Sequence, residues 1–241
     1  MTTPVNTQIN KKALFLDLFL ILATLFAIKY FLLQFSSTWT FAGPVSLIVA
    51  LTIASWRLKS RSQLWSELGF AHTQSHIKLL LWTVGALVVT IVTGVIAGAI
   101  ANGLLSPQVV NEQTINFTQN RFADVPGNLP VYLYWLLVSW IIGGFTEELL
   151  FRGYLLNRFE SIFTGLPAKT TLAIIAQAVI FGQQHMYYQG ITGMVETGLI
   201  GIVSGTIYIL CGRRLWPLII SHGLANTLGM TMIYLGNVPA A

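Results

Sequence analysis

The chain is a succession of long apolar runs separated by short polar stretches. A membrane-spanning helix needs about 20 mainly apolar residues. Seven runs approach this length, at residues 13–35, 40–56, 79–104, 130–152 and beyond, 170–187, 191–211 and 215–236. The pattern predicts an all-α polytopic membrane protein with about seven transmembrane helices, within a range of six to eight.

The polar stretches between the runs divide the chain without creating a second soluble domain. Residues 57–78 are typical of a basic loop with a short surface helix around Trp65, and we expect residues 105–129 to form a loop on the opposite side. We separate an N-terminal part, residues 1–125, from residues 126–236, where the polar motifs described below are concentrated. Both parts are expected to lie in one membrane domain.

Composition and charge support a membrane protein and exclude other classes. Hydrophobic residues make up 54% of the chain and charged residues only 9%, against roughly a quarter charged residues in soluble domains. The net charge of +5 comes from scattered basic residues, so we expect no nucleic-acid partner. The single cysteine, Cys211, excludes a disulfide framework and a cysteine-based zinc site.

The basic residues also predict an orientation in the cell membrane. Lys and Arg concentrate in the cytoplasmic loops of membrane proteins. With a cytoplasmic N-terminus, Arg121 is the one basic residue in the outer loops, and ten face the cytoplasm: Lys11, Lys12, Arg57, Lys59, Arg61, Lys78, Arg158, Lys169, Arg213 and Arg214. We therefore predict a multi-pass protein with its N-terminus in the cytoplasm. Lys29 and Arg152 remain inside apolar runs, where Lys29 is expected to snorkel or to pair within the bundle.

Ionisable groups at membrane depth indicate functional sites, and the fourth run contains the strongest example. Within Gly143–Gly153, Glu148 and Arg152 stand at positions i and i+4 with the acid first, the favourable order for a salt bridge on a helix. Glu147 points about 100° away on an ordinary α-helix and is left without this partner. The alternative is that both glutamates lie in water at a helix end.

Two histidine motifs follow on separate apolar runs. His185 ends the sequence Phe181-Gly-Gln-Gln-His, and His222 precedes Asn226 by four residues, which places both on one helix face. An interfacial or buried structural histidine is the alternative for His185, and ordinary interhelical hydrogen bonding is the alternative for His222 and Asn226.

The depths of these groups agree only if the fourth helix continues past Arg152 to about Phe163. Glu147 then lies roughly 24 Å from that helix end, and His185 lies roughly 22 Å from the start of its own helix. On this basis we expect Glu147, His185, His222 and Asn226 to share one water-accessible cavity that opens toward the cytoplasm.

The three motifs, in this order, resemble those of the CPBP family of intramembrane endopeptidases, the CAAX-protease and bacteriocin-processing proteins also called the Abi family. The resemblance rests on Glu147-Glu148-x-x-x-Arg152, Phe181-x-x-x-His185 and His222-x-x-x-Asn226 and covers about residues 130–230. It makes residues 126–236 the expected catalytic core and says little about residues 1–125.

The resemblance implies a role for each motif residue. Glu147 activates a water molecule with His185 as its partner, and the water attacks the scissile carbonyl. His222 and Asn226 stabilise the oxyanion or help to bind the attacking group, while Glu148 and Arg152 hold the helix and Glu147 in place. A carboxylate suits general-base work, and preorganised donors stabilise an oxyanion strongly.

The resemblance leaves the cofactor and the substrate open. Family members are usually called metalloproteases, and Glu147, His185 and His222 could ligate a divalent metal such as zinc, yet the same groups can activate water without one. The expected substrate is a membrane-associated protein or peptide, with CAAX-type or bacteriocin-related processing as the family precedents.

Three other interpretations remain open at this stage. A proton- or cation-coupled transporter would use Glu147, His185 and His222 as a relay. A serine protease would pair Ser204 with His222, although Ser204 fits a helix-packing face more simply. A non-catalytic membrane scaffold would be favoured if Glu147 proved dispensable.

Overall fold

The protein is a bundle of long helices, and no strand occurs in the part of the chain that the computed structural model describes, residues 11–71 and 75–237. The bundle contains α1 (Lys11–Leu32), α2 (Ser36–Trp39), α3 (Ala42–Ser60), α4 (His76–Leu105), α5 (Pro107–Phe122), α6 (Leu129–Val138), α7 (Asn157–Ile162), α8 (Lys169–Leu210) and α9 (Trp216–Tyr234). A short 3₁₀ helix, η1 (Trp65–Leu68), lies where a surface helix was predicted, and a π-helical stretch, η2 (Ser139–Leu156), joins α6 to α7.

Among the residues that the structure describes, four helices are long and apolar enough to cross a membrane: α1, α4, the continuous helix Leu129–Ile162 and α8. The helix Leu129–Ile162 confirms that the fourth run continues past Arg152. The all-helical membrane architecture is therefore confirmed, whereas the number of about seven spans stays a prediction.

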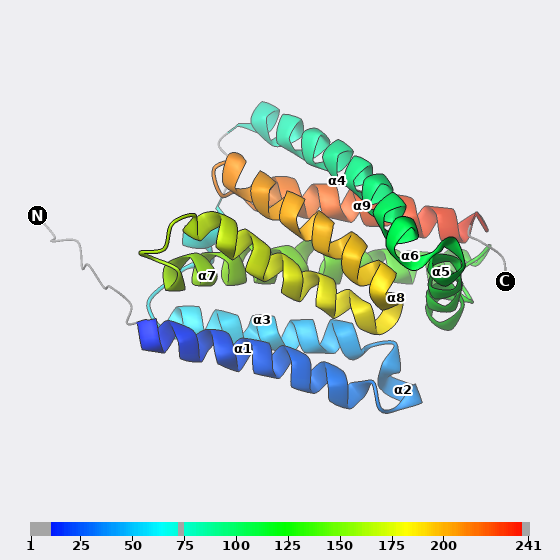
Figure 1. The fold of residues 1–241 in the computed structure, drawn as a ribbon, viewed down its shortest axis with the longest axis horizontal. Helices are drawn as coiled ribbons and strands as arrows, with labels where there is room; N and C mark the ends of the chain where they lie inside the picture. Colours follow the sequence, from blue (N-terminus) through cyan, green and yellow to red (C-terminus); the bar gives the residue numbers. More distant parts are fainter. Residues whose placement is uncertain (1–10, 72–74, 238–241) are drawn as a thin grey trace, which may run out of the picture.

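The helix α8 folds back on itself at Gly190 and corresponds to two of the predicted runs. Gly190 has φ 65° and ψ −161°, a conformation open to glycine because it lacks a Cβ. The two arms then run antiparallel, since Gln177 Nε2 donates to the carbonyl of Gly201 at 2.8 Å and Gly182 lies against Gly198. Figure 1 shows the arms of α8 side by side in the middle of the bundle.

The helix η2 occupies the centre of the bundle and carries the first polar motif. It packs against α3, α8 and α9, while α1 packs on α3 and α4 packs on α8 and α9 (Figure 1). An ion-pair cluster ties α1 to α3, because Asp17 accepts hydrogen bonds from Arg57 and Arg61, each at 2.6 Å. The hydrogen bond to Asp17 raises the pKa of Arg61.

Residues 105–129, predicted to be a loop, contain the 16-residue helix α5, so that prediction is wrong. The sequence starts this helix with Pro107, which is favourable in a first turn because its missing N–H would be unpaired there. Tertiary contact then holds the polar helix, since the side-chain oxygen of Gln113 accepts a hydrogen bond from the backbone of Thr192 at 3.0 Å. In Figure 1, α5 covers the end of the bundle opposite the start of α1 and the end of α7.

Candidate active site

Glu148 is the buried centre of the polar network. Its Oε1 accepts a hydrogen bond from Arg152 Nη1 at 3.0 Å, which confirms the predicted i, i+4 pair. The same oxygen lies 2.8 Å from His222 Nδ1, a contact between helices that the sequence did not predict. Arg152 is fully buried, and its guanidinium carbon lies 4.5 Å from the centre of the Phe181 ring. Glu148 therefore joins the first motif to the other two.

The hydrogen bond to Glu148 determines which nitrogen of the His222 ring carries a proton. A carboxylate accepts hydrogen bonds, so Nδ1 carries the proton and Nε2 points away from Glu148. Nε2 lies 3.9 Å from Glu147 Oε2, beyond a direct hydrogen bond but within reach of a bridging water.

Glu147 differs from Glu148 as the sequence predicted. Its carboxylate makes no hydrogen bond to any residue within 11–71 or 75–237, and its side chain remains 12% exposed, against 2% for Glu148. It lines a cavity together with His185. Glu148 is therefore engaged in structural contacts, and Glu147 is available to a ligand or a water molecule.

His185 lies where two cavities adjoin. Its Nδ1 is 2.9 Å from the carbonyl of Phe181, which makes Nδ1 the donor and leaves Nε2 free. It lines one cavity with Glu147 and a second with His222 and Asn226. The structure therefore brings the predicted residues to one region, from η2 and both histidine helices.

Glycines in η2 allow α9 to come close enough for these contacts. A Cβ on Gly144 would lie 3.2 Å from the Ile219 carbonyl, and a Cβ on Gly143 would overlap the amide of Asn226. Asn226 Nδ2 donates to the carbonyl of Ser139 at 3.2 Å, which fixes its side chain beside Gly143. The Gly-Gly pair thus lets Asn226 sit against η2.

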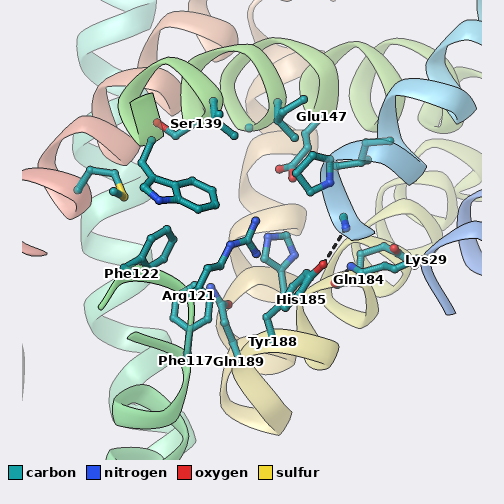
Figure 2. A pocket seen from close by; sticks show the side chains of 18 of the residues that line it. Lys29, Phe117, Arg121, Phe122, Ser139, Glu147, Gln184, His185, Tyr188 and Gln189 are labelled. Carbon is teal, nitrogen blue, oxygen red and sulfur yellow. Dashed lines mark hydrogen bonds between the residues drawn. The ribbon is translucent and has the colours of Figure 1, made fainter. Parts of the chain in front are cut away.

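The cavity around Glu147 lies toward the end of the bundle covered by α5, since Phe117, Arg121 and Phe122 of α5 line it. Figure 2 shows Glu147, His185, Lys29 and Arg121 directed toward one space, with Phe122 of α5 beside it. The predicted basic cytoplasmic loops lie at the opposite end of the bundle. The opening toward the cytoplasm stays a prediction, because it depends on the orientation of the chain in the membrane.

Lys29 and Arg121 are cavity residues that sequence reasoning missed as part of the site. Lys29 is 3% exposed and donates to the carbonyl of Gln184, next to His185. The position of Lys29 inside an apolar run could have indicated that this residue belongs to the site. Arg121 gave no such signal, because it lies in the segment that was predicted to be a loop.

The side chains do not assemble a three-ligand metal site. In the described residues, no group of three His, Cys, Asp or Glu side chains is placed to hold a metal ion. We therefore derive no step that passes through a metal.

Ser204 lies in the second cavity with His222 but is not coupled to it. No hydrogen bond joins the two in the described part of the chain, and both nitrogens of His222 face glutamates. A Ser204–His222 nucleophile pair therefore has no geometric support.

Fold and site together define a polytopic α-helical membrane protein with a carboxylate–histidine centre buried among its helices. Residues 129–228, which contain all three motifs, match the family described as type II CAAX prenyl endopeptidase Rce1-like. The match covers less than half of the chain and agrees with the resemblance seen in the sequence.

Comparisons with curated proteins and with solved structures say less about this chain. The chain is 31% identical over 114 residues to an uncharacterized 24.3 kDa protein of Escherichia coli, a match that covers 47% of this chain and 50% of that protein. The chain thus spans about half the length of this relative. No solved structure matches the chain.

Proposed function

We propose that this protein is an intramembrane endopeptidase that hydrolyses a peptide bond in a membrane-associated protein or peptide. The observation that carries the proposal is the contrast between two adjacent glutamates inside the family-matched segment. Glu148 is neutralised by Arg152 and orients His222, whereas Glu147 faces a cavity with no hydrogen-bond partner in residues 11–71 and 75–237. An unpaired carboxylate in a sheltered cavity is suited to act as a general base.

In the proposed reaction, Glu147 removes a proton from a water molecule held between its carboxylate and the histidines. The water oxygen attacks the carbonyl carbon of the scissile bond, and the carbonyl oxygen becomes an oxyanion. Glu147 then returns the proton to the amide nitrogen as the carbon–nitrogen bond breaks, so that one water is consumed and an acid and an amine are formed.

The imidazoles and the amide have supporting roles in this scheme. His222 acts on the oxyanion through Nε2, because Glu148 holds its other nitrogen. Asn226, fixed on the Ser139 carbonyl, lies in the same cavity as His222 and supplies the second of its two amide protons. His185 presents Nε2 to the water, with its ring anchored on the Phe181 carbonyl.

In this proposal, residues 1–125 support the catalytic core at residues 126–236 and form part of the cavity wall. CAAX-type or bacteriocin-related processing is the proposed substrate class. We also propose a cell-membrane location with a cytoplasmic N-terminus. The transporter and scaffold alternatives are not favoured by the family match.

The proposal is tested by comparing membrane peptides in cells that produce wild type, Glu147→Gln or Glu67→Gln. Glu67 is an exposed glutamate of η1 and serves as the matched control for removal of one carboxylate charge. We expect uncleaved membrane peptides to accumulate with Glu147→Gln and not with Glu67→Gln. Equal peptide profiles for wild type and Glu147→Gln would overturn the proposal.

A further inference from the structure

A separate cavity lies at the end of the bundle away from α5, where the start of α4 meets the turn between α8 and α9. Its volume is about 500 Å³, and its wall includes Lys78 and Trp82 of α4, Leu210 of α8 and Arg214 of the turn. Figure 1 shows the start of α4 near this turn. Glu147 and the motif histidines line other cavities, so this one is distinct from the candidate active site.

The two adjacent arginines of the turn differ in their contacts. Arg213 donates to Asn157 Oδ1 at 2.8 Å and to Glu160 Oε2 at 2.7 Å, so its charge is paired. In the described part of the chain, the side chains of Arg214 and Lys78 make no hydrogen bond or ion pair, and no acidic residue lines their cavity. The cavity therefore presents two positive charges that are available to an anion.

The cavity lies at the depth expected for lipid headgroups. The helix α4 has 30 residues and is therefore about 45 Å long, close to the thickness of a bilayer that includes its headgroups. Lys78 lies in the first turn of α4, and Leu210 is the last residue of α8, which is also long and apolar enough to cross a membrane. Both helix ends thus reach the polar region of the bilayer.

Apolar side chains adjoin the cavity on the outside of the bundle. Ile77, Leu80 and Leu81 of α4 are 73%, 63% and 66% exposed, and Leu210 of α8 is 65% exposed. Trp82, a residue type enriched where membrane meets water, lines the cavity itself. A phospholipid matches both features, because its phosphate can contact the cations while its acyl chains lie against the exposed leucines. A free phosphate matches only the cations.

We propose that this cavity binds the headgroup of an anionic phospholipid, with Lys78 and Arg214 on its phosphate and its acyl chains along α4 and the end of α8. Lys and Arg bind phosphate oxygens in proteins, and basic cavities between spanning helices bind lipid headgroups. Two positive charges without an acidic neighbour favour a headgroup with net negative charge over a zwitterionic one. The inference is independent of the proposed function, because lipid binding requires no cleavage.

The test compares two phospholipids that share their acyl chains and differ in headgroup charge. Native mass spectrometry of the full chain in detergent, titrated with dioleoyl phosphatidylglycerol or dioleoyl phosphatidylcholine, gives the Kd of the first bound lipid. If each cation contributes about fivefold, wild type should bind phosphatidylglycerol about 25-fold more tightly than phosphatidylcholine. This preference should fall to about fivefold in Lys78→Gln and in Arg214→Gln, and to about one in the double variant.

A matched control removes a cation at the same end of the bundle but outside the cavity. Lys59 is an exposed residue in the last turn of α3, and Lys59→Gln should keep the wild-type preference. Arg214→Lys should keep most of it, because the charge remains. A merely structural role for Arg214 would change the affinity for both lipids alike, which distinguishes it from headgroup binding.

Three outcomes would overturn the inference. The first is equal binding of the two lipids by wild type, and the second is an unchanged preference in the double variant of Lys78 and Arg214. The third is loss of the bound phosphatidylglycerol when ammonium phosphate replaces ammonium acetate at equal ionic strength, which would assign the cavity to a free phosphate. We expect the bound lipid to persist under that exchange, because phosphate cannot replace the contacts of the acyl chains.

Discussion

The two adjacent glutamates should respond in opposite ways to the same substitution. Replacing Glu148 by Gln removes the charge that Arg152 and His222 both contact, at 3.0 and 2.8 Å. Arg152 is fully buried, and two of its nitrogens already lack partners in the described structure. Breaking a buried ion pair by removing one partner costs about 3–5 kcal/mol.

Replacing Glu147 by Gln should leave the fold nearly unchanged. Glu147 loses no hydrogen bond within residues 11–71 and 75–237, and its carboxylate lies 3.9 Å from His222 Nε2. We expect a stability change within about 0.5 kcal/mol, as for substitutions that break no buried interaction. Cleavage should fall by a factor of roughly 10² to 10⁴, the usual contribution of a general base.

Thermal unfolding of the detergent-solubilised variants and cleavage of accumulated membrane peptides measure these two effects separately. At about 2–4 °C per kcal/mol for chains of this size, Glu148→Gln should unfold roughly 6–20 °C below wild type, whereas Glu147→Gln should unfold within a few degrees of it. Wild-type stability of Glu148→Gln would refute the proposed structural role of Glu148. Near-normal turnover by Glu147→Gln would refute its assignment as the base.

Two further predictions concern topology and packing. In a variant without the native cysteine, Asn237→Cys should react with an impermeant thiol reagent in intact cells, and Ser60→Cys should react only after lysis. The reason is that the distribution of basic residues predicts a cytoplasmic N-terminus. The reverse labelling pattern would show that the chain has the opposite orientation. Gly143→Ala should displace the amide of Asn226, cost about 1–3 kcal/mol and lower cleavage, because its Cβ has no room. Gly229→Ala, whose Cβ meets nothing within 4 Å, should leave both stability and cleavage near wild type, and equal effects of the two substitutions would contradict this account of packing.

Local sequence patterns were sufficient for the helices and for contacts within one helix. The apolar runs correspond closely to the helices, and the run beyond Arg152 continues to Ile162 as the depth argument required. The pairing of Glu148 with Arg152 also followed from the sequence, because positions i and i+4 meet on any helix whose neighbours do not interfere. The prediction that Glu147 differs from Glu148 depended on this local pair alone.

The polar helix α5 shows where hydrophobic patterning failed. Residues 107–122 contain several Asn and Thr residues, which are weaker helix formers than Ala or Leu, and no long apolar run. The helix is held by partners that lie far away in the sequence, such as the backbone of Thr192 near the Gly190 turn. Its presence places Arg121 in the wall of the cavity that contains Glu147.

The sequence by itself determined an all-helical membrane protein, its three polar motifs and the salt bridge between Glu148 and Arg152, because each depends on hydrophobicity or on spacing along one helix. Only the tertiary structure decided that His222 binds Glu148, that Gly143 admits Asn226, and that Lys29 and Arg121 face the same cavity as Glu147. The physical reason is that contacts between helices depend on their rotation, depth and separation. These quantities are set by the packing of the whole bundle, including the π-helical stretch that carries the glutamates.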